Sequence, residues 1–137
     1  MKSQSLYEAP SKHWTPTAVV VDDDAFVLAS IVAKLKKMNV EATSFQAVAP
    51  AIAHLNRVKV DFAIIDLGLP DGDGTEIITA MRSSKTNAET PVVVVTASKD
   101  DKVFMSTLKD GRAMFVSQKP IDWSCLEYLL EGTVLNG

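Results

Sequence analysis

The sequence is poor in cysteine and has no long apolar stretch. Cys125 is the one cysteine among 137 residues, so no internal disulfide can form, and a disulfide-rich secreted scaffold is excluded. The longest apolar runs are short, at 18–21 and 91–95, and a membrane-spanning helix needs about 20 apolar residues. Residues 1–16 lack the apolar middle region of a signal peptide. We therefore expect a cytoplasmic protein without a membrane segment.

The sequence also lacks an excess of basic residues. Lysine and arginine total 14 against 17 aspartates and glutamates, which gives a net charge of −3. Because duplex binding usually requires a basic face, we expect no direct contact with nucleic acid. The composition, 47% hydrophobic and 23% charged, is typical of one compact domain. We expect a flexible leader over 1–16, a domain over 17–132, and a tail or the start of a linker over 133–137.

Short apolar runs alternate with stretches of helical periodicity from residue 18 onward. The predicted strands are 18–21, 40–45, 61–66, 91–96 and 114–118. The predicted helices are 28–38, 47–56, 75–84, one that begins at Ser98, and one from Asp122 to about Gly132. Residues 67–74 are predicted to form a loop, and Cys125 to pack within the last helix. Strict alternation predicts an α/β fold with a doubly wound, five-stranded parallel sheet flanked by five helices, in the flavodoxin-like order 2-1-3-4-5.

Polar residues stand where four of these strands end. They are Asp22 and Asp23 after the first strand, Asp66 at the third, Thr96 at the fourth and Lys119 after the fifth. The carboxyl ends of parallel strands share one edge of the sheet, and neighbouring strands lie about 4.8 Å apart. The residues should therefore converge around Asp66. The fifth strand is about 10 Å from the third, so only a long side chain such as Lys119 reaches back.

This set of residues indicates phosphoryl chemistry. Three crowded carboxylates raise one another's pKa unless a cation neutralises them, and Mg²⁺ is bound by such carboxylates together with water. Asp66 would then attack phosphorus as a nucleophile, assisted by the charge of Lys119 and the hydroxyl of Thr96. Taken singly, each residue also fits a helix cap, a turn or an ordinary strand end. Their occurrence together at matching strand ends favours the chemical interpretation.

Four segments resemble the receiver domains of bacterial two-component response regulators. They are Val20-Val-Asp-Asp23, Asp66-Leu-Gly-Leu-Pro70 with Asp73-Gly74, Val95-Thr-Ala97 and Lys119-Pro120. The resemblance covers about residues 17–131. It implies a signalling domain that is not an enzyme on other molecules, because it catalyses only its own phosphorylation and dephosphorylation. The phosphoryl donor it implies is a sensor histidine kinase or a histidine phosphotransfer protein.

The same resemblance assigns roles to individual residues. It implies Asp66 as phosphoryl acceptor, Thr96 as switch hydroxyl and Lys119 as partner of the phosphoryl group. It also implies a Mg²⁺ site made of Asp23, Asp66, the backbone carbonyl of Gly68 and, mostly through water, Asp22. A partner or a second copy would meet the face made by helix four, strand five and helix five, here within 103–128. The sequence leaves two alternatives open beyond this domain: a single-domain regulator, or a longer protein with an output domain after the C-terminus.

One departure from the family concerns the aromatic switch residue. The family usually has an aromatic three residues before the lysine, where this chain has Val116, while Phe115 lies one residue earlier. The stretch from Gly111 to Lys119 also looks one residue longer than usual. A bulge at Ser117-Gln118 would make Phe115 the switch residue. A longer preceding loop would instead leave Val116 in that place, and the sequence leaves both alternatives open.

A rival interpretation is a phosphatase fragment of the haloacid-dehalogenase type. Asp22-x-Asp24 resembles the first motif of those enzymes, with Asp22 as nucleophile and no role for Asp66. Two features oppose it: Phe26 replaces the usual hydroxyl residue, and no acidic pair follows Lys119. A third interpretation is a pseudo-receiver that only binds partners, which the complete acidic set disfavours.

Overall fold

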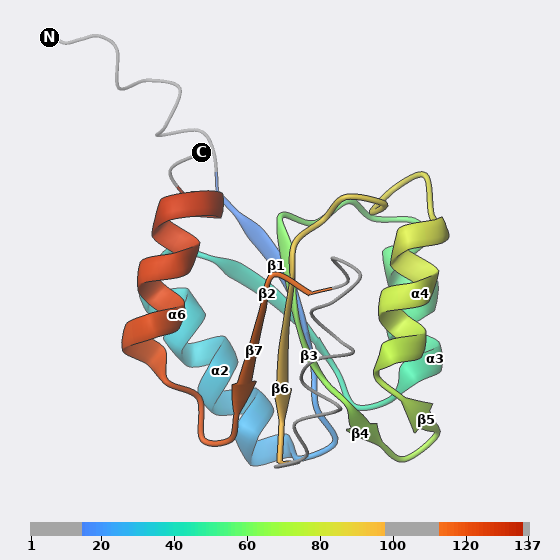
Figure 1. Cartoon of the computed structure of the whole chain (residues 1–137), viewed down its shortest axis with the longest axis horizontal. Coiled ribbons are helices and arrows are strands. Elements are labelled where there is room, and N and C mark those ends of the chain that lie inside the picture. Colours follow the sequence, from blue (N-terminus) through green and yellow to red (C-terminus); the bar gives the residue numbers. More distant parts are fainter. Residues whose placement is uncertain (1–14, 98–112, 136–137) are drawn as a thin grey trace, which may run out of the picture.

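A computed structural model describes residues 15–97 and 113–135. Its centre is a parallel five-stranded sheet in the order β2-β1-β3-β6-β7, which confirms the predicted topology. The strands are β1 (Thr17–Val21), β2 (Glu41–Phe45), β3 (Phe62–Asp66), β6 (Val92–Thr96) and β7 (Phe115–Gln118). Helices cover both faces of this sheet (Figure 1).

The helices of the described residues form two pairs. On one face of the sheet lie α2 (Ala25–Lys37) and α6 (Trp123–Leu130), which continues into the π-helical turn η1 (Glu131–Leu135). The other face carries α3 (Val48–Leu55) and α4 (Thr75–Ser83) (Figure 1). The helix predicted to begin at Ser98 lies outside the described residues. Within them, no helix has the length and apolar character needed to cross a membrane.

Two apolar cores fill the space between sheet and helices, because successive strand residues point to opposite faces. The core beneath α3 and α4 takes strand residues Val19, Val21, Ala63, Ile65, Val92 and Val94. The core beneath α2 and α6 takes Ala18, Val20, Phe62, Ile64, Val93 and Val95. Both β3 and β6 are buried over their whole length, as central strands of a parallel sheet should be.

Three details differ from the sequence prediction. The loop predicted over 67–74 contains a short antiparallel hairpin made of β4 (Gly68–Leu69) and β5 (Gly72–Asp73). Cys125 is exposed, contrary to our prediction, because Leu126 and Leu130 are the residues of α6 that face the core. Leu135, which we assigned to the tail, is partly buried against that core. The domain limits themselves remain a prediction.

Of the two alternatives for the fifth strand, the bulge at Ser117-Gln118 is wrong for this structure. The pairing of β6 with β7 runs without interruption from Val93 opposite Phe115 to Thr96 opposite Gln118. Phe115 therefore packs into the core beneath α2 and α6, whereas Val116 packs against the core beneath α3 and α4. A regular strand fixes this alternation, and only an extra residue in the strand would have reversed it.

Asn87 closes the edge of the sheet opposite to the carboxyl ends of the strands. Its side chain is fully buried, and its amide nitrogen donates to the carbonyls of Leu55 (2.6 Å) and Val58 (2.8 Å). Its amide oxygen accepts from the backbone N–H of Val60 (3.1 Å) and from the hydroxyl of Thr90 (2.8 Å). One amide thus satisfies four polar groups where α3 ends and the chain turns into β3.

We expect Asn87→Ala to destabilise the fold by about 3 kcal/mol, roughly 10 °C in Tm, because it leaves buried polar groups without partners. Urea unfolding followed by circular dichroism measures this change. Asn56→Ala, at an exposed position after α3, is the matched control and should stay within about 0.5 kcal/mol of the wild type. Equal stabilities of the two variants would contradict the role assigned to Asn87.

Candidate phosphoryl-transfer site

The end of β1 carries three consecutive aspartates with different surroundings. Asp22 is buried, and its backbone N–H donates to the carbonyl of Phe45 (3.1 Å), which extends the contact with β2 by one residue. Asp23 is exposed at the sheet edge. Asp24 begins α2, since its carboxylate accepts from the backbone N–H groups of Phe26 (2.8 Å) and Val27 (3.2 Å). The sequence also allowed this acidic run to be a helix cap, and Asp24 is the residue that caps α2. Asp22 and Asp23 do not cap the helix and lie at the edge of the sheet.

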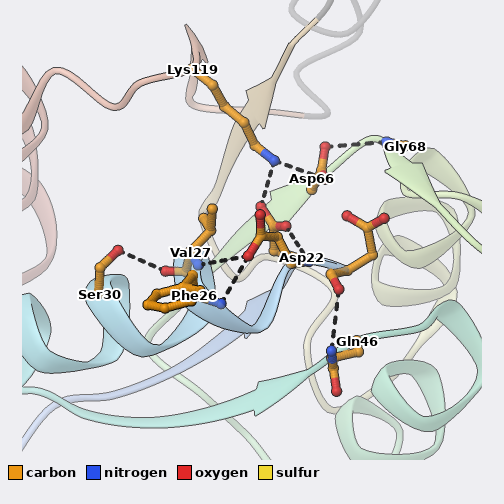
Figure 2. A network of polar contacts seen from close by, with 10 residues as sticks. Asp22, Phe26, Val27, Ser30, Gln46, Asp66, Gly68 and Lys119 are labelled. Carbon is orange, nitrogen blue, oxygen red and sulfur yellow. Dashed lines mark hydrogen bonds and ion pairs between the residues drawn. The ribbon is translucent and has the colours of Figure 1, made fainter.

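Lys119 bridges the ends of β1 and β3. Its ammonium nitrogen lies 2.7 Å from Oδ2 of Asp22 and 3.1 Å from Oδ2 of Asp66 (Figure 2). The Lys119 backbone N–H donates to the carbonyl of Thr96 (2.9 Å), which holds the end of β7 against β6. Asp66 also accepts a hydrogen bond from the N–H of Gly68 (3.2 Å). The predicted convergence of strand ends around Asp66 is therefore present in the structure.

The three predicted acidic residues lie close enough for one cation to contact all of them. Asp22, Asp23 and Asp66 each offer a carboxylate oxygen, and these oxygens lie within 4.8 Å of one another. Above them is a pocket of about 500 Å³. Its lining consists of Asp23, Asp66, Leu67, Gly68, Asp73, Thr96, Ala97 and Lys119. The pocket thus unites residues from the ends of four strands with an open space over Asp66.

Burial and charge perturb the two central ionisable groups. Desolvation raises the pKa of Asp66 above its ordinary value. The hydrogen bond from Lys119, the hydrogen bond from the Gly68 N–H and the positive charge of Lys119 lower the pKa, but they offset the desolvation only in part. Repulsion from Asp22 raises the pKa of Asp66 further, but it is the smallest contribution. For Lys119, desolvation lowers the pKa, yet its contacts with Asp22 and Asp66 outweigh this and leave the pKa raised. Lys119 therefore stays protonated at neutral pH.

A glycine allows the loop after Asp66 to close tightly. The N–H of Gly74 donates to the carbonyl of Leu67 (2.8 Å), and a Cβ at Gly74 would collide with the backbone carbonyl of Asp66. At Gly68, in contrast, an added Cβ would meet no atom within 4 Å, because that residue faces the open pocket. The two glycines thus differ in role. Gly74 allows the backbone after the loop to approach the backbone of Asp66 closely, and Gly68 leaves space over the site.

Sequence reasoning assigned no site role to Asp73, Asp71 or Gln46. Asp73 lines the pocket, and its carboxylate accepts from the N–H of Thr75 (2.9 Å) at the start of α4. Asp71 and Gln46 connect the site to α3 through hydrogen bonds. The Asp71-Gly-Asp-Gly74 run marks a turn, but nothing in its spacing indicates which distant backbone groups its carboxylates contact.

Thr96 is buried at the end of β6, on the same face of the sheet as Val92 and Val94. Val116 packs on that face as well, and its partner in the β6–β7 register is Val94, two residues before Thr96. Phe115 lies on the opposite face. Any packing change that begins at the Thr96 side chain therefore meets Val116 before it meets Phe115.

Because burial disfavours the charged form of Asp66, we expect Asp66→Asn to raise the Tm at pH 7 in a chelating buffer. The sign follows from linkage: a raised folded-state pKa reduces stability as the pH rises through it, whereas Asn carries no charge. The gain should vanish below about pH 3.9, the ordinary pKa of an aspartate, because the acid is then neutral in both states. Thermal melts from about pH 3 to about pH 8 span this range, with the exposed Asp73→Asn as control. A lower Tm for Asp66→Asn at pH 7 would contradict the balance described above.

The chain is similar to known response regulators. The family model described as response regulator receiver domain matches residues 18–131. The transcriptional regulatory protein PrrA of Mycobacterium leprae is 30% identical over 89 residues, which are 65% of this chain and 38% of PrrA. The virulence transcriptional regulatory protein PhoP of Salmonella typhimurium is 31% identical over 100 residues, 73% of this chain and 44% of PhoP. The chain thus matches less than half the length of these relatives.

A solved structure shows the same fold. The receiver domain of the sensor histidine kinase PA1611 from Pseudomonas aeruginosa, with magnesium in its active-site cleft, superposes with a TM-score of 0.77 at 18% identity. The match covers 90% of this chain and all of that domain. Since the family model spans most of the sequence and the sheet order agrees, the chain belongs to the receiver domains of response regulators.

Proposed function

We propose that Asp66 accepts a phosphoryl group from a histidine kinase or histidine phosphotransfer protein in a Mg²⁺-dependent, cytoplasmic reaction. One observation carries this proposal: the Asp66 carboxylate lies beneath an open pocket, between two further carboxylates and an ammonium group 3.1 Å away. The haloacid-dehalogenase alternative would make Asp22 the nucleophile. Asp22 is buried and paired with Lys119 at 2.7 Å, and it does not line the pocket, so the geometry favours Asp66.

The donor set fits a hard divalent cation. Asp22, Asp23 and Asp66 offer carboxylate oxygens, and the exposed Gly68 beside them would add its backbone carbonyl. The negative charge of the three carboxylates is balanced by the positive charge of one Mg²⁺ together with the Lys119 ammonium, so a bound ion would neutralise the cluster. When bound, Mg²⁺ supplies charge stabilisation to the oxygens of the transferring phosphoryl group. The magnesium in the cleft of the PA1611 receiver domain supports this assignment.

The protein residues would divide the remaining work. A carboxylate oxygen of Asp66 forms the new O–P bond, while the bond between phosphorus and the donor's imidazole nitrogen breaks. Lys119 and the Thr96 hydroxyl meet the charge that develops on the phosphoryl oxygens. Their backbones are already joined at 2.9 Å, so both groups are held beside Asp66 before any donor arrives. Under this proposal, catalysis by the chain is limited to its own phosphorylation and dephosphorylation.

We infer that Thr96 and Val116 form the switch. Movement of the Thr96 side chain toward a phosphoryl group would open space on the face of β6 that Val116 shares. Val116 would then respond where the family commonly uses an aromatic residue. This assignment replaces the alternative that used Phe115.

The surface beside the pocket suits an approaching donor protein. Phe26 is 87% exposed on the first turn of α2, next to the acidic run. A second pocket, of about 480 Å³, borders Val27, Lys119, Pro120, Ile121 and Trp123. An exposed aromatic beside an apolar pocket is a feature of protein-binding surfaces.

Self-association and an output domain complete the proposed function. A second copy would bind at the face predicted within 103–128, of which residues 103–112 lie outside the described part of the chain. Tyr128, on α6, is 82% exposed on this face. An output domain would follow the C-terminus, as the greater length of PrrA and PhoP suggests.

Incubation with Mg²⁺ and a small acyl phosphate should add one phosphoryl group, seen as a mass increase of about 80 Da. Asp66→Asn should abolish the addition, because an amide cannot serve as the nucleophile. Asp22→Asn should keep a reduced level, since Asp23 and Asp66 remain. The opposite pattern, with loss only in Asp22→Asn, would favour the phosphatase alternative.

Mg²⁺ should raise the Tm of the wild-type chain by mass action, since it binds only the folded state. At about 100 times Kd the added stability is about 2.7 kcal/mol. Asp23→Ala should remove this response, whereas Asp61→Ala, at the opposite edge of the sheet, should keep it. A wild-type response in Asp23→Ala would show that the ion binds elsewhere.

A further inference from the structure

We propose that the start of α3 is a positioning element of the metal site, which holds the loops after β1 and β3 together through Gln46 and Asp71. This inference rests on the proposed function, because it concerns the affinity of the same site for Mg²⁺. Neither residue lines the pocket, so both would act through the backbone of the residues that do.

The N-terminus of α3 is capped by a residue from the loop after β3. The residue at its own N-cap position is Ala47, which has no side-chain acceptor. Asp71 takes over this function: its carboxylate accepts from the backbone N–H groups of Val48 (2.6 Å) and Ala49 (3.1 Å). A helix N-terminus presents unpaired N–H groups and a positive dipole end, so an ionised carboxylate is a favourable partner.

The same junction also contacts the loop after β1. The side-chain amide of Gln46 donates to the backbone carbonyl of Asp23 (3.2 Å), as Figure 2 shows for the labelled Gln46. One residue earlier, the carbonyl of Phe45 accepts the N–H of Asp22. The last residue of β2 and the residue after it therefore contact two consecutive residues of the acidic run that follows β1.

The hairpin after β3 transmits the position of Asp71 to Gly68. Gly68 pairs with Asp73 and Leu69 with Gly72, so Asp71 lies in the tight turn of the hairpin. This hairpin lies near the start of α3 (Figure 1), and a Cβ at Gly72 would lie 3.5 Å from the Val48 side chain. Displacing Asp71 from α3 would therefore also displace the loop that carries Gly68.

These contacts form a continuous path of short steps beside the site. From Asp23 the path runs through Gln46 to the first turn of α3, then through Asp71 and the hairpin to Gly68 and Asp66. A cation that takes ligands from both loops needs them at a fixed separation. Because these hydrogen bonds hold the two loops together before the ion binds, less conformational entropy is lost on binding. Contacts to residues that carry metal ligands tune metal affinity in this way.

The test compares Mg²⁺ affinity between wild type, Asp71→Ala, Asp71→Asn and Gln46→Ala, by calorimetry or by an NMR titration. We expect Asp71→Ala and Gln46→Ala each to raise the Mg²⁺ Kd by about ten-fold. Asp71→Asn should retain part of the affinity, because its one amide oxygen can still accept from the Val48 N–H, whereas its NH₂ group cannot accept from the Ala49 N–H. The Mg²⁺ concentration for half-maximal phosphorylation by a small acyl phosphate should rise in parallel, with little change in the rate at saturating Mg²⁺.

Asp61→Ala is the matched control, because the Asp61 carboxylate accepts from the Thr17 N–H (2.8 Å) at the opposite edge of the sheet. It should lower the Tm without changing the Mg²⁺ Kd. If Asp71→Ala behaves like this control, Asp71 is only a helix cap and the inference is overturned, as it is if Gln46→Ala leaves the Kd unchanged. Gln46→Ala alters one exposed side chain, so it decides the question should Asp71→Ala fail to fold. A wild-type chain that does not bind Mg²⁺ would instead refute the proposed function itself.

Discussion

The contact of one ammonium with two buried carboxylates is the constraint on which the arrangement of the site depends. Asp22 and Asp66 are almost fully removed from solvent, and an unpaired buried charge costs several kcal/mol. The Lys119 ammonium lies within 3.1 Å of both carboxylates. This contact requires the carboxyl ends of β1, β3 and β7 to be aligned along the strand direction. The uninterrupted strand registers and the backbone bond from Lys119 to Thr96 provide that alignment.

Much of this arrangement was predictable from the sequence because few topologies satisfy the alternation of strands and helices. Once the strand order is fixed, residues that end the strands must share an edge, so the proximity of Asp22, Asp66 and Lys119 needed no coordinates. Periodicity also located the helix predicted over 28–38, most of which lies within α2 (Ala25–Lys37). The last helix was predicted to begin at Asp122, and Asp122 caps α6 by accepting from the N–H of Cys125.

The failures arose where a tertiary contact decides the local structure. The cap of α3 comes from Asp71, 23 residues beyond Val48, and no local pattern identifies that partner. The sequence at the start of α3 shows only that a cap is missing, because Ala47 has no polar side chain to accept from the first N–H groups of the helix. The facing of Phe115 depended on whether one extra residue lay in the strand or in the loop before it. A shift of the strand register by one residue turns every side chain of the strand to the opposite face of the sheet, and composition does not specify the register.

The charge balance of the site explains why its response would begin at Thr96 and β7. Without a cation, three carboxylates face one ammonium, so the site carries excess negative charge that burial makes costly. A bound cation would relieve this excess, but a phosphoryl group on Asp66 would add negative charge again. Lys119 and Thr96 line the pocket beside Asp66 with side chains that can donate to that group, and they are joined through their backbones. Under the proposed function, a shift of either one would move the ends of β6 and β7 together and so alter the packing around Val116.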